Sequence, residues 1–207
     1  MTTADAIRSQ IAQVGRWLYE KRLIAATEGN ISVRLGDRVL ITPSGQCKGL
    51  LDPGEIVETD LDGSKTSGEG SPSSEVILHL AIYRRRPDVG AVVHAHPPYA
   101  TAFAVAGIAL DRPVLPEVVL LIGKVPLVAY ATPGSDEAAN NVGTLIEGHD
   151  ALLLGNHGVV TCGADLCSAF FRMETLEHFA WISTIARVLG GQRELTAEQV
   201  ALIEALR

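Results

Sequence analysis

The amino-acid sequence predicts an α/β protein: a single-domain three-layer α/β/α sandwich around a mixed, mostly antiparallel central sheet. Segments with helical and with strand periodicity alternate along the 207 residues, without a repeat or a convincing linker between them. The run Ala91–Ala95 is apolar almost throughout, which is typical of a strand covered on both faces. A chain of this length with 47% hydrophobic residues can bury a sizeable core. We therefore expect one domain over residues 1–207.

The first half of the chain predicts two helices that flank a group of short strands. Apolar residues recur at helical spacing in Ile7, Ile11, Val14 and Leu18, and Gly29 lies just past this helix. A Gly-Asp turn joins the first two predicted strands, and a stretch rich in Gly, Ser and Asp precedes the second helix. The predicted strands are 31–34, 39–42 and 56–59, the loop is 60–74, and the helix is 75–86.

The second half predicts further strands between helices. The buried strand that contains His94 ends at two prolines, which cannot donate hydrogen bonds to a central strand. The turn Gly155–Gly158 separates two short apolar segments and predicts a hairpin. The predicted strands are 125–129, 151–154 and 159–161, and the predicted helices are 99–106, 135–147, 166–189 and 197–206.

Composition excludes several classes of protein. The net charge of −7 speaks against nonspecific binding to nucleic acid or to an anionic membrane, so neither is expected as a partner. No apolar segment is long and uninterrupted enough to span a bilayer, and charged residues break up the first helix, unlike a signal peptide. The three cysteines form no C-x-x-C pair, as in reduced intracellular proteins. These observations predict a cytoplasmic protein.

Two histidines on the buried strand are the first candidate functional residues. His94 and His96 are two apart, so their imidazoles point to the same face of the strand. A further histidine and a carboxylate, His157 and Glu75, would complete a tetrahedral zinc site. The alternative is a pair of core histidines with ordinary hydrogen-bond partners. His79 lies one helical turn after Glu75 and is expected to be a supporting or core residue rather than a ligand.

Three turns with small polar residues are candidate anion sites. Ser71–Glu75 opens a helix, where backbone N–H groups and the hydroxyls of Ser73 and Ser74 could hold an anion. The alternative for these serines is simple helix capping. The turns Gly29-Asn30 and Ser44-Gly45 offer further N–H groups and side-chain donors, although glycine turns are common in loops.

Five motifs in order resemble the class II aldolase/adducin family, and among its branches the L-fuculose-1-phosphate aldolases. They are Gly-Asn-Ile-Ser (29–32), Thr-Pro-Ser-Gly (42–45), Ser-Ser-Glu (73–75), Arg-Pro-Asp-Val-Gly-Ala-Val-Val-His-Ala-His-Pro (86–97) and Asn-His-Gly-Val-Val (156–160). The resemblance implies a three-layer α/β/α fold and a homotetramer with active sites at subunit borders. It also implies one zinc ion held by His94, His96 and His157, with Glu75 as the fourth ligand or the acid/base. The implied phosphate pocket consists of Gly29, Asn30, Ser44, Gly45, Ser73 and Ser74.

The same resemblance favours one reaction over three alternatives. The expected reaction is metal-dependent, reversible cleavage of a ketose 1-phosphate to dihydroxyacetone phosphate and a short aldehyde, without a Schiff-base lysine. The 4-epimerases of the family carry Asp where this chain has Glu75, and adducin-like binding modules lack the complete set of metal ligands. Methylthioribulose-1-phosphate dehydratases remain an alternative, because they also use a Glu in the region of Glu117.

Glu117 is where this chain departs from the fuculose-phosphate aldolases. Those enzymes have a tyrosine as proton donor in the region that aligns with residues 115–118, and a second tyrosine from the C-terminal tail of a neighbouring subunit. In this chain Glu117 stands at the first place, and no tyrosine follows Tyr130 that could take the second role. Glu117 is surrounded by apolar residues, so burial would raise its pKa towards neutrality and suit it to acid/base work near the zinc. The alternative is an exposed or structurally paired glutamate. We predict Glu75 and Glu117 as the catalytic carboxylates.

Overall fold

The computed structural model describes residues 3–206 of the chain. An eight-stranded sheet runs through this part of the molecule. The strand order is β4-β3-β2-β1-β5-β8-β7-β6, with every neighbouring pair antiparallel except β6 and β7. The predicted mixed, mostly antiparallel sheet is confirmed. The strands are β1 Asn30–Leu35, β2 Arg38–Ile41, β3 Val57–Asp60, β4 Lys65–Ser67, β5 Ala91–Ala95, β6 Leu127–Val128, β7 Ala151–Leu154 and β8 Gly158–Gly163.

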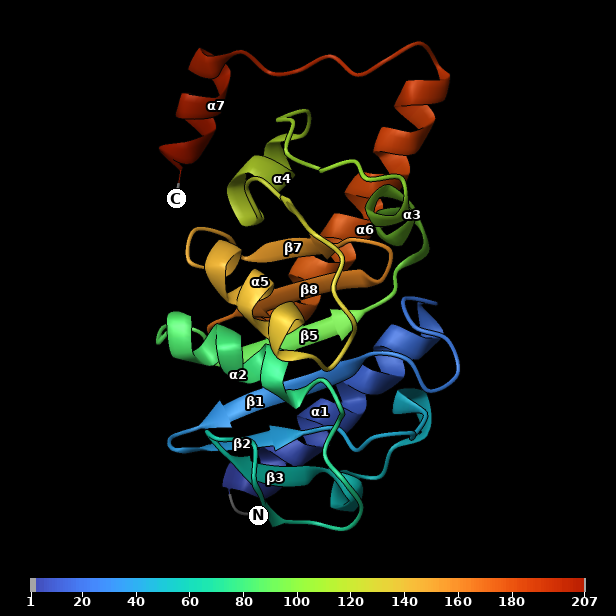
Figure 1. Cartoon of the computed structure of the whole chain (residues 1–207). Coiled ribbons are helices and arrows are strands. Elements are labelled where there is room, and N and C mark those ends of the chain that lie inside the picture. The colour runs from blue at the N-terminus through green and yellow to red at the C-terminus, as the bar shows by residue number, and fades with distance from the viewer. Residues whose placement is uncertain (1–2, 207) are drawn as a thin grey trace.

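Helices cover both faces of the sheet and make the three layers (Figure 1). Helices α2 and α5 lie in front of it in this view, and α1 and α6 lie behind it. The apolar residues form two cores that the sheet separates: Ala91, Val93 and Ala95 belong to one, and Val92 belongs to the other. The helices are α1 Thr3–Glu20, α2 Val76–Arg85, α3 Pro98–Val105, α4 Pro116–Leu121, α5 Asp136–Ile146, α6 Leu166–Val188 and α7 Ala197–Glu204, and Lys48–Leu50 and Pro53–Glu55 are short 3-10 turns.

Three short elements differ from the sequence-based expectation. Strand β4 lies inside the predicted loop 60–74; its residues are all exposed at the edge of the sheet, so no apolar alternation marks it. Helix α4 occupies the apolar run after Leu115, where Pro116 at the helix start favours a helix that the apolar pattern alone does not reveal. Strand β6 is shorter than predicted, because Val125 forms only an isolated bridge with Leu110.

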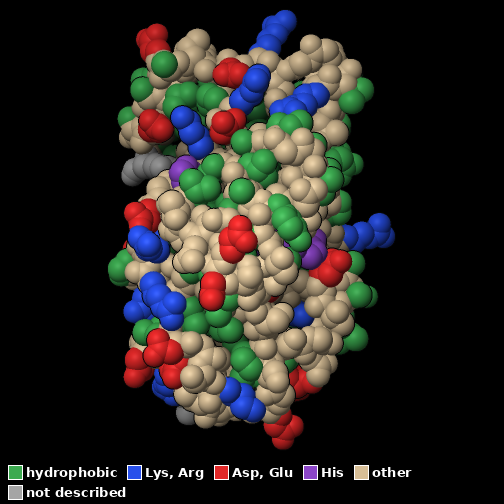
Figure 2. All heavy atoms as spheres, in the orientation of Figure 1, with side chains coloured by type: hydrophobic (Ala, Val, Ile, Leu, Met, Phe, Trp, Pro, Cys, Tyr) green, Lys and Arg blue, Asp and Glu red, His purple; other side chains and the backbone are tan. Residues whose placement is uncertain are grey.

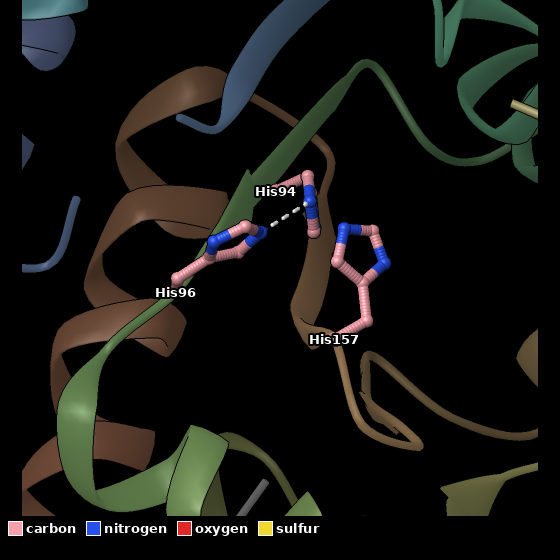
Figure 3. A group of neighbouring side chains, drawn as sticks. All are labelled: His94, His96 and His157. Carbon is pink, nitrogen blue, oxygen red and sulfur yellow. Dashed lines mark hydrogen bonds between the residues drawn. The ribbon is translucent and has the colours of Figure 1, made fainter. Parts of the chain in front are cut away.

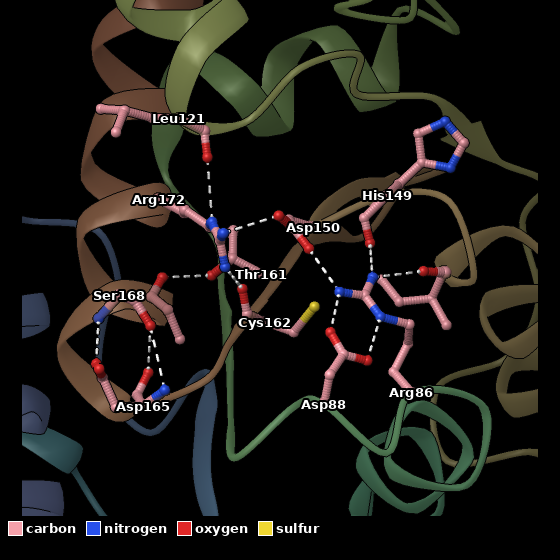
Figure 4. Close-up of polar contacts among 12 residues, drawn as sticks. Arg86, Asp88, Leu121, His149, Asp150, Thr161, Cys162, Asp165, Ser168 and Arg172 are labelled. Atoms are coloured by element: carbon pink, nitrogen blue, oxygen red, sulfur yellow. Dashed lines mark hydrogen bonds and ion pairs between the residues drawn. The ribbon is translucent and has the colours of Figure 1, made fainter. Parts of the chain in front are cut away.

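A network of ion pairs at one end of the sheet joins the segment before β5 to the segment before β7 and to α6 (Figure 4). The Arg86 guanidinium forms ion pairs with Asp88 and Asp150 at 2.7 and 2.9 Å, and Arg172 of α6 reaches the other oxygen of Asp150 at 2.8 Å. Arg172 also donates to the carbonyls of Cys162 and Leu121. Because Asp88 precedes β5 and Asp150 precedes β7, the network positions the starts of these two strands.

The outer surface mixes charges of both signs. On the face shown in Figure 2, Lys and Arg side chains are interspersed with Asp and Glu side chains rather than gathered on one side. Within residues 3–206, the helices are too short or too polar for any of them to cross a bilayer.

Candidate metal centre

Three histidines meet at the end of the central strands (Figure 3). His94 is the fourth residue of β5, His96 follows that strand directly, and His157 lies in the turn between β7 and β8. Each offers a nitrogen within 4.8 Å of those of the other two. The Nε2 atoms of His94 and His96 are 3.2 Å apart. The sequence-based expectation that these imidazoles lie together is therefore met by the fold.

Contacts on the far side of two rings determine which nitrogen faces the cluster. Nδ1 of His94 donates to the Val159 carbonyl at 2.9 Å, which leaves Nε2 as an acceptor. Nδ1 of His96 lies 3.3 Å from Oε2 of Glu28, a carboxylate that the sequence analysis did not identify. Partners of this kind orient metal-binding histidines and select their tautomer.

Two glycines allow this close arrangement. A Cβ on Gly158 would lie 2.4 Å from Cδ2 of His96, so any larger residue would displace that ring. A Cβ on Gly29 would lie 2.8 Å from the His94 carbonyl, and Gly29 also has a φ of +71°, which disfavours other residues. The two glycines lie in two of the five sequence motifs. The close approach of His96 to Gly158 and of the His94 carbonyl to Gly29 is the physical reason why glycine is needed at these positions.

Glu75 faces the histidine cluster from the residue just before α2. Its Oε2 is 3.3 Å from Nε2 of His94, and its Oε1 is 3.6 Å from Nε2 of His157. The Asn30 side chain donates to Oε2 at 2.8 Å, whereas Oε1 is buried and has no hydrogen-bond partner. A buried carboxylate oxygen without a partner is costly, unless a cation or a proton occupies the space in front of it.

Burial gives these groups the protonation states that a metal ion requires. It lowers the pKa of His94 to about 3 and also lowers the pKa of His157, so both imidazoles are neutral. For Glu75, burial raises the pKa, but attraction to His94 and His157 at pH values where those rings are protonated, together with the Asn30 hydrogen bond, outweighs it, so the pKa lies below its ordinary value. The cluster thus combines neutral imidazoles with an ionised carboxylate.

The geometry fits a divalent metal better than a set of core histidines. In the metal-free chain the Nε2 atoms of His94 and His96 share a hydrogen bond of 3.2 Å, with His94 as the acceptor because its Nδ1 donates to Val159. A divalent cation can take the place of the proton between these two atoms. Tetrahedral zinc with nitrogen ligands would separate two such atoms by about 3.3 Å. The donor set of three imidazoles and one carboxylate suits zinc, although another divalent metal can use the same atoms.

The candidate anion residues are brought together beside this cluster. The Ser44 N–H donates to the Ser71 carbonyl at 3.0 Å, and the Ser73 N–H donates to the Thr42 carbonyl at 3.2 Å. These two hydrogen bonds hold the 42–45 and 71–74 segments side by side, with Ser44, Gly45 and Ser74 exposed. Asn30 is tied to the same place through Glu75.

Lys48 is a second residue that the sequence analysis missed. Its side chain is buried, and Nζ donates to the carbonyls of Thr27 and Gln46 at 2.7 and 2.8 Å. Burial lowers the pKa of this lysine, while the nearby Cys47 and Glu75 act in the opposite direction. Since Thr27 precedes Gly29 and Gln46 follows Gly45, Lys48 connects two of the three candidate anion segments.

Glu117 lies outside the cluster in the single chain. It is exposed in the first turn of α4, so the expectation that it is desolvated is wrong for the chain by itself. The physical reason is that a carboxylate is favoured at a helix N-terminus and reaches water there. His149 and His178 are likewise not members of the cluster.

Comparison with known proteins places this site in a family. The profile of the Class II Aldolase and Adducin N-terminal domain matches residues 9–184. A 3-oxo-tetronate 4-phosphate decarboxylase of Escherichia coli O6:H1 is 37% identical over 95% of this chain and 94% of its own. An L-fuculose phosphate aldolase of Methanococcus maripaludis is 37% identical over 86% of this chain and 96% of its own.

A solved structure agrees with the sequence comparisons. An L-fuculose 1-phosphate aldolase superimposes with a TM-score of 0.92 at 31% identity, covering 100% of this chain and 97% of the other. The match extends over the sheet, its covering helices and the motifs that carry the histidine cluster. The chain belongs to the class II aldolase and adducin N-terminal domain family.

Proposed function

We propose that this chain is a metal-dependent aldehyde-lyase that interconverts a ketose 1-phosphate with dihydroxyacetone phosphate and a short aldehyde. The observation that carries the proposal is the position of Glu75. Its carboxylate faces His94 and His157, and it directly follows the anion residues Ser73 and Ser74. A metal-binding cluster and an anion-binding segment therefore share one residue. The proposed substrate is L-fuculose 1-phosphate or a related pentulose or 5-deoxypentulose 1-phosphate.

The proposed cofactor is one zinc ion per subunit, held by His94, His96 and His157. Glu75 lies where its carboxylate can complete the donor set or move a proton beside it. When bound, the metal supplies a Lewis acid that stabilises negative charge on the substrate oxygens. The chain's own contribution is to present neutral imidazoles in a fixed orientation, with Val159 and Glu28 holding two of the rings.

The phosphate of the substrate is proposed to bind the three small-residue segments. The residues are Gly29, Asn30, Ser44, Gly45, Ser73 and Ser74. The cross-links between the segments 42–45 and 71–74, and the Lys48 contacts with residues 27 and 46, would keep these donors in place before the substrate arrives. Binding a non-reacting part of the substrate positions the reacting carbons.

Two carboxylates account for the proton transfers in the synthetic direction. Ionised Glu75 takes a proton from C3 of dihydroxyacetone phosphate, and the electron pair left behind delocalises as an enediolate. The enediolate carbon attacks the aldehyde, and the new C3–C4 bond leaves its electron pair on the former aldehyde oxygen, which takes a proton from Glu117. Cleavage is the reverse sequence. The lowered pKa keeps Glu75 ionised, which is the form that can accept a proton.

Glu117 would act in the site of a neighbouring subunit. It is exposed in the single chain, and the homotetramer proposed from the family resemblance has its sites at subunit borders. A carboxylate that is exposed on its own chain can then be buried against another. Such an arrangement reconciles an exposed Glu117 with an acid/base role.

Decarboxylation of a 3-oxo-tetronate 4-phosphate is a second candidate, favoured by the relatives of that name that match nearly the whole chain. Loss of CO2 from C1 leaves its electron pair on C2, next to the C3 carbonyl. The result is the same enediolate of dihydroxyacetone phosphate, which gives dihydroxyacetone phosphate when that carbon takes up a proton. No aldehyde oxygen needs a proton in this reaction, so it requires less of Glu117.

A product assay separates the candidates. The protein with zinc would be incubated with the 1-phosphates of fuculose, ribulose, 5-deoxyribulose and methylthioribulose, and with 3-oxo-tetronate 4-phosphate. We expect dihydroxyacetone phosphate with an aldehyde from one of the ketose phosphates, and none of either from the Glu75→Gln variant. CO2 with dihydroxyacetone phosphate would select the decarboxylase. A product that has only lost water would select a dehydratase, and failure of all five substrates would overturn the proposal.

A further inference from the structure

A chain of buried hydrogen bonds leads from the interior of the protein to Glu75. Starting at α2, the Tyr83 hydroxyl lies 2.7 Å from the Ser32 hydroxyl, which lies 2.7 Å from Nδ1 of His79. Nε2 of His79 lies 2.5 Å from Oδ1 of Asn30, whose Nδ2 is 2.8 Å from Oε2 of Glu75. Ser32 and His79 are fully buried, and Asn30 and Tyr83 nearly so.

With a neutral His79, only one assignment of donors along these hydrogen bonds satisfies every contact. The Asn30 NH2 donates to Oε2 of Glu75, so its carbonyl is the atom that faces Nε2 of His79 and accepts from it. His79 must then carry its proton on Nε2, which leaves Nδ1 to accept from Ser32. Ser32 in turn accepts from the Tyr83 phenol. The acceptor oxygen of Glu75 thus determines, through two hydrogen bonds and the Asn30 amide, which nitrogen of His79 carries the proton.

The chain also makes the two oxygens of Glu75 unequal. Oε2 receives the Asn30 hydrogen bond, whereas Oε1 is buried without a partner and faces Nε2 of His157. A carboxylate held through one oxygen cannot rotate freely, and its other oxygen stays available. The position of Asn30 supports this arrangement, because its backbone lies opposite His94 in the register of β1 and β5.

We propose that Tyr83, Ser32 and His79 are positioning residues, which act through Asn30 to hold Glu75 and to reserve its Oε1 for the metal or the substrate proton. The expected effect on turnover rests on the proposed function. The expected tautomer of His79 does not, because it follows from the hydrogen bonds alone. None of the three side chains touches the substrate. Their effect would be on turnover, through the orientation of Glu75, rather than on substrate binding.

The first experiment reads the tautomer directly. In protein labelled with 15N-histidine, the His79 signals are assigned by their loss in His79→Gln, and the nitrogen shifts report which ring nitrogen bears hydrogen. At pH 7.5 we expect a neutral ring with hydrogen on Nε2, and a population with hydrogen on Nδ1 in Glu75→Gln, whose amide can donate to Asn30 and so reverse the order of donors. Hydrogen on Nδ1 in the wild-type protein would overturn the inference, whether or not the proposed reaction occurs.

The second experiment measures turnover and zinc content. Ser32→Ala should lower kcat by about 10- to 100-fold, with unchanged KM and zinc content, as for other residues that orient a metal-site ligand. His79→Gln, which retains an amide donor for Asn30, should keep more kcat than His79→Leu. The matched control is Ser183→Ala, because Ser183 is also fully buried but its hydroxyl has no partner and lies on α6.

The outcomes of the second experiment separate positioning from simple stability. If Ser32→Ala and Ser183→Ala melt at similar temperatures but only the former loses kcat, the role in positioning is supported. Equal kcat in the wild type, Ser32→Ala and Ser183→Ala would contradict this role, and so would a Ser32→Ala protein in which only KM changes. If none of the substrates is turned over, the proposed function fails, and the tautomer measurement still decides the structural part of the inference.

Discussion

The Nε2 atoms of His94 and His96 face each other at 3.2 Å, and each ring is turned there by a partner of its other nitrogen. For His94 the partner is the Val159 carbonyl on the adjacent strand β8, and for His96 it is the Glu28 carboxylate from the loop before β1. The two Nε2 atoms share a hydrogen bond there, and a divalent cation can take the place of its proton.

Loss of one histidine should abolish stoichiometric metal binding. We expect the wild-type protein to hold about one zinc per subunit. His96→Ala should lose most of this zinc, because only two imidazoles and one carboxylate of the donor set remain. Metal analysis after dialysis measures this, with His178→Ala as the control, since His178 is exposed and outside the cluster. Full zinc occupancy of His96→Ala would remove His96 from the ligand set.

A methyl group at Gly158 should disturb the site by displacing a ring. Its Cβ would lie 2.4 Å from Cδ2 of His96 and 2.7 Å from the Ala95 carbonyl, so the ring must move. We expect Gly158→Ala to weaken zinc affinity by about 10-fold or more. Gly148→Ala is the control, because a Cβ there would contact nothing within 4 Å. Identical zinc affinities, measured by competition with a chelator, would refute the steric account.

Removing the Lys48 ammonium should loosen the anion segments. In Lys48→Met the carbonyls of Thr27 and Gln46 lose their shared donor, while the apolar stem is retained. We expect KM for a phosphorylated substrate to rise about 10-fold, and the melting temperature to fall. Lys124→Met, at an exposed position, is the control. An unchanged KM alongside a lowered melting temperature would show that Lys48 contributes only to stability.

The metal-free protein should lose stability as the pH falls, in part because of His79. Burial lowers its pKa from an ordinary 6.5 to about 4 in the folded state. Between these values the unfolded chain binds the proton and the folded chain does not, so stability falls from pH 6.5 towards pH 4. The full contribution is about 3 kcal/mol.

Urea unfolding of the metal-free protein at pH 7.5, 6 and 5 tests this sign. As the pH is lowered, the free energy of unfolding should decrease less steeply in His79→Gln than in the wild-type protein. The exposed His178, replaced by Gln, serves as the control, and its variant should keep the wild-type slope. A His79→Gln protein as steeply dependent on pH as the wild type would show that His79 is not held neutral.

A mixture of two inactive variants should recover activity if Glu117 serves a neighbouring subunit. We expect Glu117→Gln to lower kcat by about two orders of magnitude with unchanged zinc content. In oligomers coexpressed from Glu75→Gln and Glu117→Gln chains, about a quarter of the sites would combine an intact Glu75 with an intact Glu117 of the adjacent chain. Mixing the separately purified proteins without exchange is the control. Absence of recovery in the mixed oligomers would place Glu117 within its own subunit or outside the mechanism.

Local pattern was sufficient for much of the fold. The long helices and the strands of the central sheet follow from apolar periodicity, because a side chain's direction repeats every two residues in a strand and every 3.6 in a helix. The same rule placed His94 and His96 on one face, opposite the Ala91, Val93 and Ala95 face. Ordered motifs then led to His157 and Glu75, which are far from the pair in sequence.

Only the tertiary structure decided which residues support that site. Asn30 and Glu75 are 45 positions apart, and Ser32 and Tyr83 are 51 apart, so their contacts depend on the order and register of strands that no local pattern encodes. Glu28 and Lys48 look like ordinary charged loop residues until the chain folds around them. The exposure of Glu117 was decided in the same way. An apolar neighbourhood in sequence predicts burial, but the first turn of α4 directs this carboxylate to the surface, where water and the helix dipole stabilise its charge.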